Sequence, residues 1–147
     1  TLLESNQLAA EVLAEQGPRA VTDVTGFGLA GHLLEMLEAS GMAAQLRLAD
    51  LPLLPGAAEL SAEQVASTLA PANRAAEAQM EAEQSLRSDP RYALLFDPQT
   101  SGGLLWGVEA SELDSLQLRL EQATGRRAHE IGEVRAMETG GPRLRVV

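Results

Sequence analysis

The stretch VTDVTGFGLAGHLLEML, residues 21–37, decides how this chain folds around its most informative turn. A short extended segment precedes a glycine-rich turn, and leucines at helical spacing follow it. This pattern predicts a strand at residues 20–24 and a helix at residues 26–39. Gly41 stands where such a helix ends on a left-handed residue. The letters from Gly26 to Gly31 also fit G-x-G-x-x-G.

The glycine pattern leaves three interpretations open. A strand before it, a helix after it, and Asp50 at the end of the next expected strand favour a dinucleotide-binding turn. Asp23 argues against this, because its carboxylate would repel pyrophosphate unless Mg²⁺ lay between them. In the second interpretation Asp23 is a metal ligand and the helix N-terminus binds phosphate. In the third, Asp23 or Thr25 caps the helix, and the glycines only allow close packing.

A second motif, LLFDPQTSGGLLWGV, occupies residues 94–108. It predicts two apolar strands, at residues 92–96 and 104–108, joined by a turn. Thr100 and Ser101 in that turn supply hydroxyls and amides that could surround an anion. They could equally be turn residues whose side chains bond to their own backbone.

The rest of the chain alternates helical and extended patterns, and no repeat is visible. Apolar spacing predicts helices at residues 2–13 and 111–124 and strands at residues 43–48, 129–134 and 144–147. The capping-box letters of residues 61–64 predict a helix start. Residues 72–86 predict a helix or a helix-like linker. One strand pair joined only by a short turn argues for a mixed sheet covered by helices, in a single domain over residues 1–147.

The composition excludes several classes of function. The net charge is −10, with 11 basic and 21 acidic residues, which argues against binding nucleic acid through its phosphates. No apolar run is long enough to span a membrane. The absence of cysteine excludes thiolate metal sites and disulfides, and we expect a cytoplasmic protein. His32 is interpreted as a packed or hydrogen-bonded histidine rather than a ligand.

The motifs TDVTGFGLAGHLLEM and LFDPQTSGGLL, followed by IGEV at residues 131–134, together resemble the C-terminal domain of selenophosphate synthetases (selenide, water dikinases). That family belongs to the aminoimidazole ribonucleotide synthetase superfamily. The resemblance covers residues 8–134. It implies an α+β fold, a three-layer α/β/α sandwich with a mixed sheet. It also implies the conversion of ATP, selenide and water into selenophosphate, AMP and phosphate, with Mg²⁺.

The resemblance also assigns roles within the site. Asp23 matches the family's Mg²⁺–nucleotide aspartate, and we expect Thr25, Gly26, Thr100 and Ser101 beside the nucleotide. It places the catalytic Lys and Cys or selenocysteine in an N-terminal ATP-binding domain, so we expect no catalytic residue and little activity in this chain alone. It further implies a homodimer. Under this resemblance the G-x-G-x-x-G pattern is a coincidence, and no role is assigned to residues 71–74.

Two alternatives stay open. The chain could serve another ATP-dependent synthetase of the same superfamily, because the choice of substrate lies mainly in the expected N-terminal half. It could also be a non-catalytic module for nucleotide binding or dimerisation.

Overall fold

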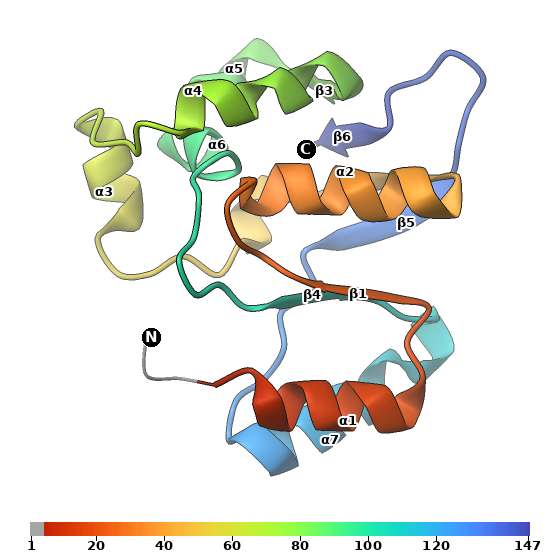
Figure 1. Cartoon of the computed structure of the whole chain (residues 1–147). Helices are drawn as coiled ribbons and strands as arrows, with labels where there is room; N and C mark the ends of the chain where they lie inside the picture. Colours follow the sequence, from red (N-terminus) through yellow and green to blue (C-terminus); the bar gives the residue numbers. More distant parts are fainter. Residues whose placement is uncertain (1–4) are drawn as a thin grey trace.

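A computed structural model describes residues 5–147, and Figure 1 shows how their helices and strands are arranged. The chain has the predicted α+β fold. The helices are α1 (Gln7–Gln16), α2 (Gly28–Ser40), α3 (Ala57–Ala62), α4 (Ala70–Asn73), α5 (Gln84–Arg87), α6 (Pro90–Leu94) and α7 (Leu113–Thr124). Three short 3₁₀ turns are Leu48–Asp50, Arg74–Gln79 and Ala110–Glu112. The strands are β1 (Ala20–Asp23), β2 (Met42–Leu46), β3 (Met80–Ala82), β4 (Leu104–Gly107), β5 (Gly132–Ala136) and β6 (Leu144–Val146).

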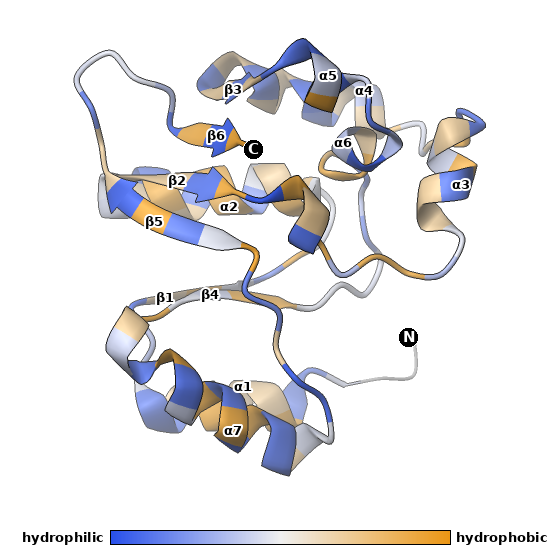
Figure 2. Ribbon diagram, turned by 180° about the vertical axis from the view of Figure 1, so that it is seen from behind, coloured by the Kyte–Doolittle hydropathy of each residue, from blue (hydrophilic) through white to orange (hydrophobic). Residues whose placement is uncertain are grey.

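The strands form two sheets. β1 pairs antiparallel with β4, so that Asp23 lies opposite Leu104. The second sheet has the order β3-β6-β2-β5. It is mixed, because β2 runs antiparallel to β5 but parallel to β6, and β3 is also parallel to β6. Figure 2 shows β2, β5 and β6 side by side, with α2 behind them.

Helices lie on both sides of the β1–β4 pair, in the α/β/α order predicted. Figure 1 shows α2 above this pair and α1 with α7 below it. The larger core lies on the α2 side, between α2, the mixed sheet and α6. Its most deeply buried members are Ala30, Leu46, Leu48, Tyr92, Leu95, Phe96 and Leu144. A second cluster of Leu13, Leu116 and Leu120 joins α1 to α7.

The prediction of a strand at residues 92–96 is wrong, because residues 92–94 belong to helix α6. The side chain of Asp89 accepts a hydrogen bond from the backbone N–H of Arg91 at 2.8 Å, which caps the helix. Pro90 occupies the first helical turn, where its missing N–H costs nothing. The Arg91 guanidinium, 2.6 Å from Asp89 Oδ2, holds the pKa of that carboxyl below its usual range. Capping therefore overrides the apolar run that suggested a strand.

Two predictions for the middle of the chain are also wrong. The helix expected to start at Ser61 instead ends there, since α3 spans Ala57–Ala62. Residues 72–86 are no continuous helix: β3 interrupts them by pairing with β6, and Met80 is buried opposite Leu144. Pairing with a distant strand determines the secondary structure of this segment, and local composition does not reveal such a pairing.

The other predicted elements are confirmed to within a few residues. These are the first and last helices, the helix after the glycine-rich turn, and the strands at β1, β2, β4, β5 and β6. Residues 2 and 3, which the first helix was predicted to include, lie outside the described residues. Within residues 5–147, no helix is long and apolar enough to cross a membrane.

Candidate functional site

The two sequence motifs meet through their backbones at the carboxyl end of β1. The N–H of Val24 donates to the carbonyl of Gly103 at 2.9 Å, and the N–H of Gln99 donates to the carbonyl of Thr25 at 3.0 Å. Thr100 and Ser101 lie in the turn between these two contacts and are exposed. The structure therefore brings the β1–α2 turn and the 97–103 turn together.

Gly28 lets the first turn of α2 lie directly against the second motif. Its φ of +70° is left-handed, and a Cβ built there would lie 2.8 Å from the carbonyl oxygen of Leu95. The N–H of Ala30 donates to that same carbonyl at 2.9 Å. Only glycine combines this φ with so close an approach, so Gly28 fixes where the helix begins.

Asn73 joins the two motifs through a single side-chain amide. Its Nδ2 donates to the carbonyl of Gly26 at 2.8 Å and to the carbonyl of Phe96 at 2.9 Å. The two acceptors belong to different motifs and are far apart in the sequence. The sequence analysis gave residues 71–74 no role, and a lone asparagine two residues after a proline offers no signal that would have found this one.

Asn6 supports the second turn from the opposite side. Its Nδ2 donates to the carbonyl of Gly102 at 2.9 Å. It was also missed, because the helix predicted at residues 2–13 includes Asn6 and gives no signal of a contact with a distant turn. Its side chain makes no capping hydrogen bond to α1.

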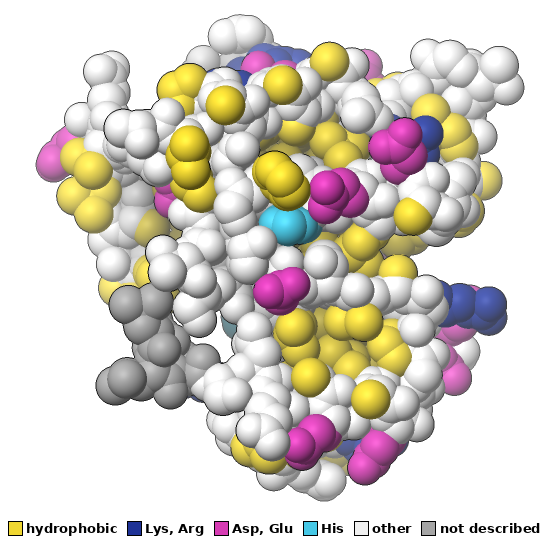
Figure 3. Space-filling view, in the orientation of Figure 1, with side chains coloured by type: hydrophobic (Ala, Val, Ile, Leu, Met, Phe, Trp, Pro, Cys, Tyr) yellow, Lys and Arg dark blue, Asp and Glu magenta, His cyan; other side chains and the backbone are white. Residues whose placement is uncertain are grey.

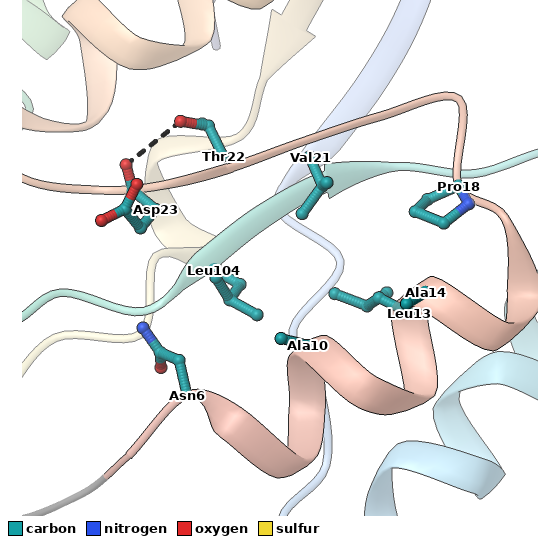
Figure 4. A pocket seen from close by; sticks show the side chains of 9 residues that line it. All are labelled: Asn6, Ala10, Leu13, Ala14, Pro18, Val21, Thr22, Asp23 and Leu104. Atoms are coloured by element: carbon teal, nitrogen blue, oxygen red, sulfur yellow. Dashed lines mark hydrogen bonds between the residues drawn. The ribbon is translucent and has the colours of Figure 1, made fainter.

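Asp23 is exposed at the end of β1, beside an open groove. Among residues 5–147, no side chain forms an ion pair or hydrogen bond with its carboxylate. Figure 4 shows this carboxylate at one end of the groove, with Leu104, Leu13 and Val21 along it. The groove has a volume of about 520 Å³. Figure 3 shows hydrophobic side chains gathered over this part of the surface.

Thr25 is the first of three neighbouring polar side chains, and its contact with His32 is a hydrogen bond. Its Oγ1 lies 3.1 Å from Nε2 of His32, and Nδ1 of His32 lies 3.3 Å from Oε2 of Glu35. His32 is only 7% exposed, and the Phe27 ring lies against it with centroids 5.5 Å apart. The interpretation of His32 as a packed, hydrogen-bonded histidine agrees with this geometry.

Several backbone amides at the site are left without a protein acceptor. In the described part of the chain, the N–H groups of Gly26, Phe27, Thr100 and Ser101 donate to no carbonyl or side chain. Free amides at the start of a helix attract anions, because the helix dipole adds to them. The arrangement can therefore hold an anionic group next to the Asp23 carboxylate, provided a cation separates the two charges.

The topology rules out the dinucleotide-binding interpretation for the described chain. In a dinucleotide-binding fold the strands before and after the first helix lie in one parallel sheet. Here β1 and β2 belong to different sheets, and β1 pairs antiparallel with β4. Asp50 lies in a 3₁₀ turn, paired with Arg47 at 2.5 Å. The G-x-G-x-x-G letters are thus a coincidence of the glycine-rich turn.

No group of three or more His, Cys, Asp or Glu side chains suited to a metal ion occurs within residues 5–147. Any metal ion at this site would therefore need oxygen ligands beyond such a cluster, and Asp23 offers one carboxylate. Mg²⁺ is commonly held by one or two carboxylates together with water and phosphate oxygens. An exposed aspartate with no partner among the described residues, at the strand end before a turn with free amides, fits one side of such a site.

Comparison with protein families matches residues 1–145 to the family described as "AIR synthase related protein, C-terminal domain". The match covers both glycine-containing turns, Asn73 and the mixed sheet except for the last residue of β6.

Curated relatives carry the name "Selenide, water dikinase". The protein of Nitratidesulfovibrio vulgaris (strain Miyazaki F) is 40% identical over 144 residues, covering 95% of this chain. That of Cronobacter sakazakii is 35% identical over 141 residues, covering 96% of this chain. The chain spans 39% and 40% of the length of these two relatives, respectively.

Proposed function

The chain belongs to the family of AIR synthase related proteins, as their C-terminal domain, and from that premise we propose that it is the C-terminal part of a working selenophosphate synthetase. The complete protein would convert ATP, selenide and water into selenophosphate, AMP and phosphate. In this proposal the chain supplies one side of the Mg²⁺–ATP site. The observation that carries it is the Asp23 carboxylate, which has no partner among the described residues and ends the strand that leads into the turn with the free amides of Gly26 and Phe27.

Asp23 is proposed as the metal ligand. Its carboxylate is exposed and has no cationic protein partner among the described residues. Mg²⁺ at this position would offset the negative charge of a polyphosphate. Thr25 and Gly26 from one turn, with Thr100 and Ser101 from the other, are proposed to lie along the nucleotide phosphates. Gly26 and the two residues of the second turn would do so through their free N–H groups.

The proposed partner is an N-terminal ATP-binding domain of the same protein, within a homodimer. The selenide-handling residues are assigned to that domain, so the chain itself holds no catalytic residue in this proposal. Two observations support a partner at the Asp23 face. The groove beside Asp23 is lined mainly by apolar side chains, and Val21 in it is 49% exposed. Exposed apolar surface next to a ligand site is typical of a face that another domain covers.

The proposal is tested with the complete protein that carries this domain. Selenide-dependent AMP formation from Mg²⁺–ATP is measured for the unchanged protein, for Asp23→Asn and for Asp114→Asn. Asp114 is an exposed aspartate on α7, outside both turns and outside the groove beside Asp23. We expect Asp23→Asn to lower kcat/KM by about a hundredfold or more, because loss of even a residue that only orients a metal ligand costs about 10–100-fold. Asp114→Asn should leave it unchanged.

Each outcome points to one conclusion. If Asp23→Asn keeps full activity, Asp23 is no metal ligand and serves at most the helix. If the unchanged protein forms AMP without any dependence on selenide, the substrate assignment fails. The other ATP-dependent synthetases of the superfamily then become the better proposal.

A further inference from the structure

The two sequence motifs run past each other in opposite directions and are joined by a series of hydrogen bonds. Backbone N–H and C=O groups link Val24 with Gly103, Thr25 with Gln99, and Ala30 with Leu95. Residue numbers rise along the first motif as they fall along the second. Gly26 and Phe96 come between the last two of these links, and both of their carbonyls accept from Nδ2 of Asn73, at 2.8 and 2.9 Å. Asn73 therefore supplies the link at this position.

Only a group with two donors can make this link. Two carbonyls cannot hydrogen-bond to each other, because each is an acceptor, whereas the amide nitrogen of asparagine carries two hydrogens on one atom. The same argument settles the orientation of the Asn73 amide: its nitrogen, and not its oxygen, must face Gly26 and Phe96. The bridge is short and directional, so it sets the spacing between the two turns.

The segment that carries Asn73 is itself fixed to the larger core. Asn73 is the last residue of α4, and its own N–H donates to the carbonyl of Leu69 at 3.2 Å. The guanidinium of Arg74, the next residue, lies 5.0 Å from the centroid of the Phe96 ring, and Phe96 is completely buried. Asn73 therefore reaches both turns from a supported position.

The bond from Asn73 also determines where one free amide points. Gly26 and Phe27 share a trans peptide bond, in which the C=O and the N–H point in opposite directions. In the described chain, the N–H of Phe27 donates to no carbonyl or side chain. Because the Gly26 carbonyl faces Asn73, this N–H points away from Asn73. Phe27 is 58% exposed, so its amide is left available to a ligand.

The geometry of the turn shows what Asn73 restrains. The N–H of Gly28 donates to the carbonyl of Thr25 at 3.1 Å, which closes a four-residue turn around the Gly26–Phe27 peptide. Phe27 has φ −87° and ψ −1°, the values of the third residue in a type I turn. A type II turn, whose central peptide has the opposite orientation, would need a positive φ at Phe27 and would break the bond from Asn73. Asn73 therefore stabilises one of the two orientations of this peptide.

We propose that Asn73 is a positioning residue for nucleotide binding: it holds the Gly26–Phe27 peptide at a fixed spacing from the 97–103 turn, so that the phosphates of one nucleotide meet both turns at once. This inference rests on the proposed nucleotide function and deepens it. Two turns that are already in place lose little entropy on binding a ligand, and a misplacement of about 1 Å can cost about a hundredfold. Asn73 acts only through the two carbonyls.

Nucleotide binding without turnover provides the first test. Isothermal titration calorimetry gives the Kd of the complete protein for adenylyl imidodiphosphate, an ATP analogue that is not hydrolysed, with saturating Mg²⁺ and without selenide. Asn73→Leu has nearly the shape of asparagine but no donor, and we expect it to raise this Kd about tenfold. Asn73→Ser keeps one donor and leaves room for water, so it preserves the fold if leucine is not tolerated. It should still raise the Kd several-fold, because one hydroxyl proton cannot bridge two carbonyls.

Arg143→Leu is the matched control, because Arg143 makes the same kind of bridge at the far end of α2. Its Nη1 donates to the carbonyls of Leu37 and Met42 at 3.1 and 3.0 Å. Arg143→Leu and Asn73→Leu should both lower the urea concentration at the midpoint of unfolding, since each removes two hydrogen bonds. Only Asn73→Leu should raise the Kd for the analogue. A comparable rise in Arg143→Leu would indicate a general loss of structure and would overturn the positioning role.

The split between two substrates gives a second readout. In the proposed function, the residues that handle selenide belong to the N-terminal domain, so the loss of Asn73 should not affect selenide. With Mg²⁺ saturating, the KM for ATP in Asn73→Leu should rise about tenfold, while the KM for selenide should change less than about twofold. Equal increases in both constants would contradict a role limited to the nucleotide.

The inference and the proposed function can fail separately. If the unchanged protein binds no analogue, or if Asp23→Asn binds it as tightly as the unchanged protein does, the proposed nucleotide role of this chain fails. If Asp23→Asn weakens binding but the folded Asn73→Leu and Asn73→Ser do not, the positioning role is overturned and the proposed function stands. A higher Kd in both Asn73 variants, with an unchanged Kd in Arg143→Leu, supports both.

Discussion

The two sides of the β1–β4 pair differ in how firmly they are packed. On the α2 side, a large core joins α2, the mixed sheet and α6, and Leu95 and Phe96 are completely buried there. On the α1 side, the buried cluster consists of Leu13, Leu116 and Leu120, backed by partly exposed residues such as Trp106. The open groove lies on this second side.

The firmly packed side therefore anchors the two turns, whereas the open side leaves Asp23 accessible. The two turns are anchored on the firm side, through Gly28, Ala30 and the carbonyl of Leu95. Asp23 faces the open side, where the groove gives it room. A rigid frame limits the entropy lost on binding, and the open side leaves the carboxylate accessible. The following substitutions test this contrast, from the largest expected effect to the smallest.

Leu95→Ala and Leu116→Ala compare the two cores directly, since both side chains are 0% exposed. Leu95→Ala should lower the free energy of unfolding by about 4 kcal/mol, because its well-packed surroundings cannot collapse into the cavity. Leu116→Ala should cost about 2.5 kcal/mol, because its partly exposed neighbours can move. Urea titrations followed by circular dichroism give both values. Equal losses would show that the two sides are packed alike.

Gly28→Ala tests whether close backbone contact holds the turns. The new Cβ would lie 2.8 Å from the carbonyl oxygen of Leu95, at a φ of +70°. We expect a loss of about 3 kcal/mol in the free energy of unfolding, from left-handed strain together with the clash.

Gly41→Ala is the matched control for Gly28→Ala. Gly41 has nearly the same φ, +67°, but no atom within 4 Å of a built Cβ. Gly41→Ala should lower the free energy of unfolding by only about 1 kcal/mol, which is the cost of the left-handed conformation. A loss at Gly28 no larger than the one at Gly41 would mean that the contact with Leu95 relaxes at little cost.

Asp89→Ala tests the cap that fixes α6 under the second motif. Removing the cap and the Arg91 ion pair should lower the free energy of unfolding by about 1 kcal/mol at pH 7. The pKa of Asp89 is lowered in the folded chain, chiefly by its hydrogen bond from the Arg91 side chain. Its stabilisation is therefore complete above the ordinary aspartate pKa of about 3.9 and is lost as the pH falls through the folded value.

The pH dependence distinguishes this cap from a packing effect. The difference in unfolding free energy between the unchanged chain and Asp89→Ala should shrink as the pH falls below about 4. Asp89→Asn, which can still cap, should lose less than Asp89→Ala at pH 7. A difference that stays constant down to pH 2 would contradict the role of the charged carboxylate.

Tyr92→Phe should have the smallest effect. The Tyr92 side chain is 1% exposed, and within the described residues its hydroxyl has no hydrogen-bond partner. Burial raises the pKa of this hydroxyl. Removing a buried polar atom without a partner should leave the free energy of unfolding unchanged or raise it by up to about 1 kcal/mol. A clear loss in urea titrations would reveal a partner for the hydroxyl.

The sequence predicts those parts of the fold that depend on local patterns. The helix after the glycine-rich turn follows from leucine spacing and Gly41, and five strands follow from short apolar runs. The segment at residues 92–96 was misjudged although its signal was present, because Asp89 and Pro90 are typical of a helix start. β3 could not be predicted locally, since Met80 is buried only through pairing with the distant β6.

The candidate site, like the fold, has parts that the sequence predicts and parts that it does not. The sequence analysis expects residues of both turns beside a nucleotide, and the structure brings Thr25 of one turn close to Gln99 of the other. The metal role of Asp23 and the nucleotide roles of the turn residues stay predictions. Asn73 and Asn6 were missed because their importance lies in long-range contacts with carbonyls, which leave no pattern in the sequence.

The double hydrogen bond of Asn73 makes the site sensitive to a change of one functional group. Deamidation would replace the amide of Asn73 by a carboxylate of nearly the same shape. The two carbonyls that now accept from one nitrogen would then face a negative oxygen, so two attractions would become two repulsions. A protein ageing in storage could lose its site in this way while its fold stays intact. Peptide mass mapping, combined with Mn²⁺ binding of the aged protein, would reveal such a loss.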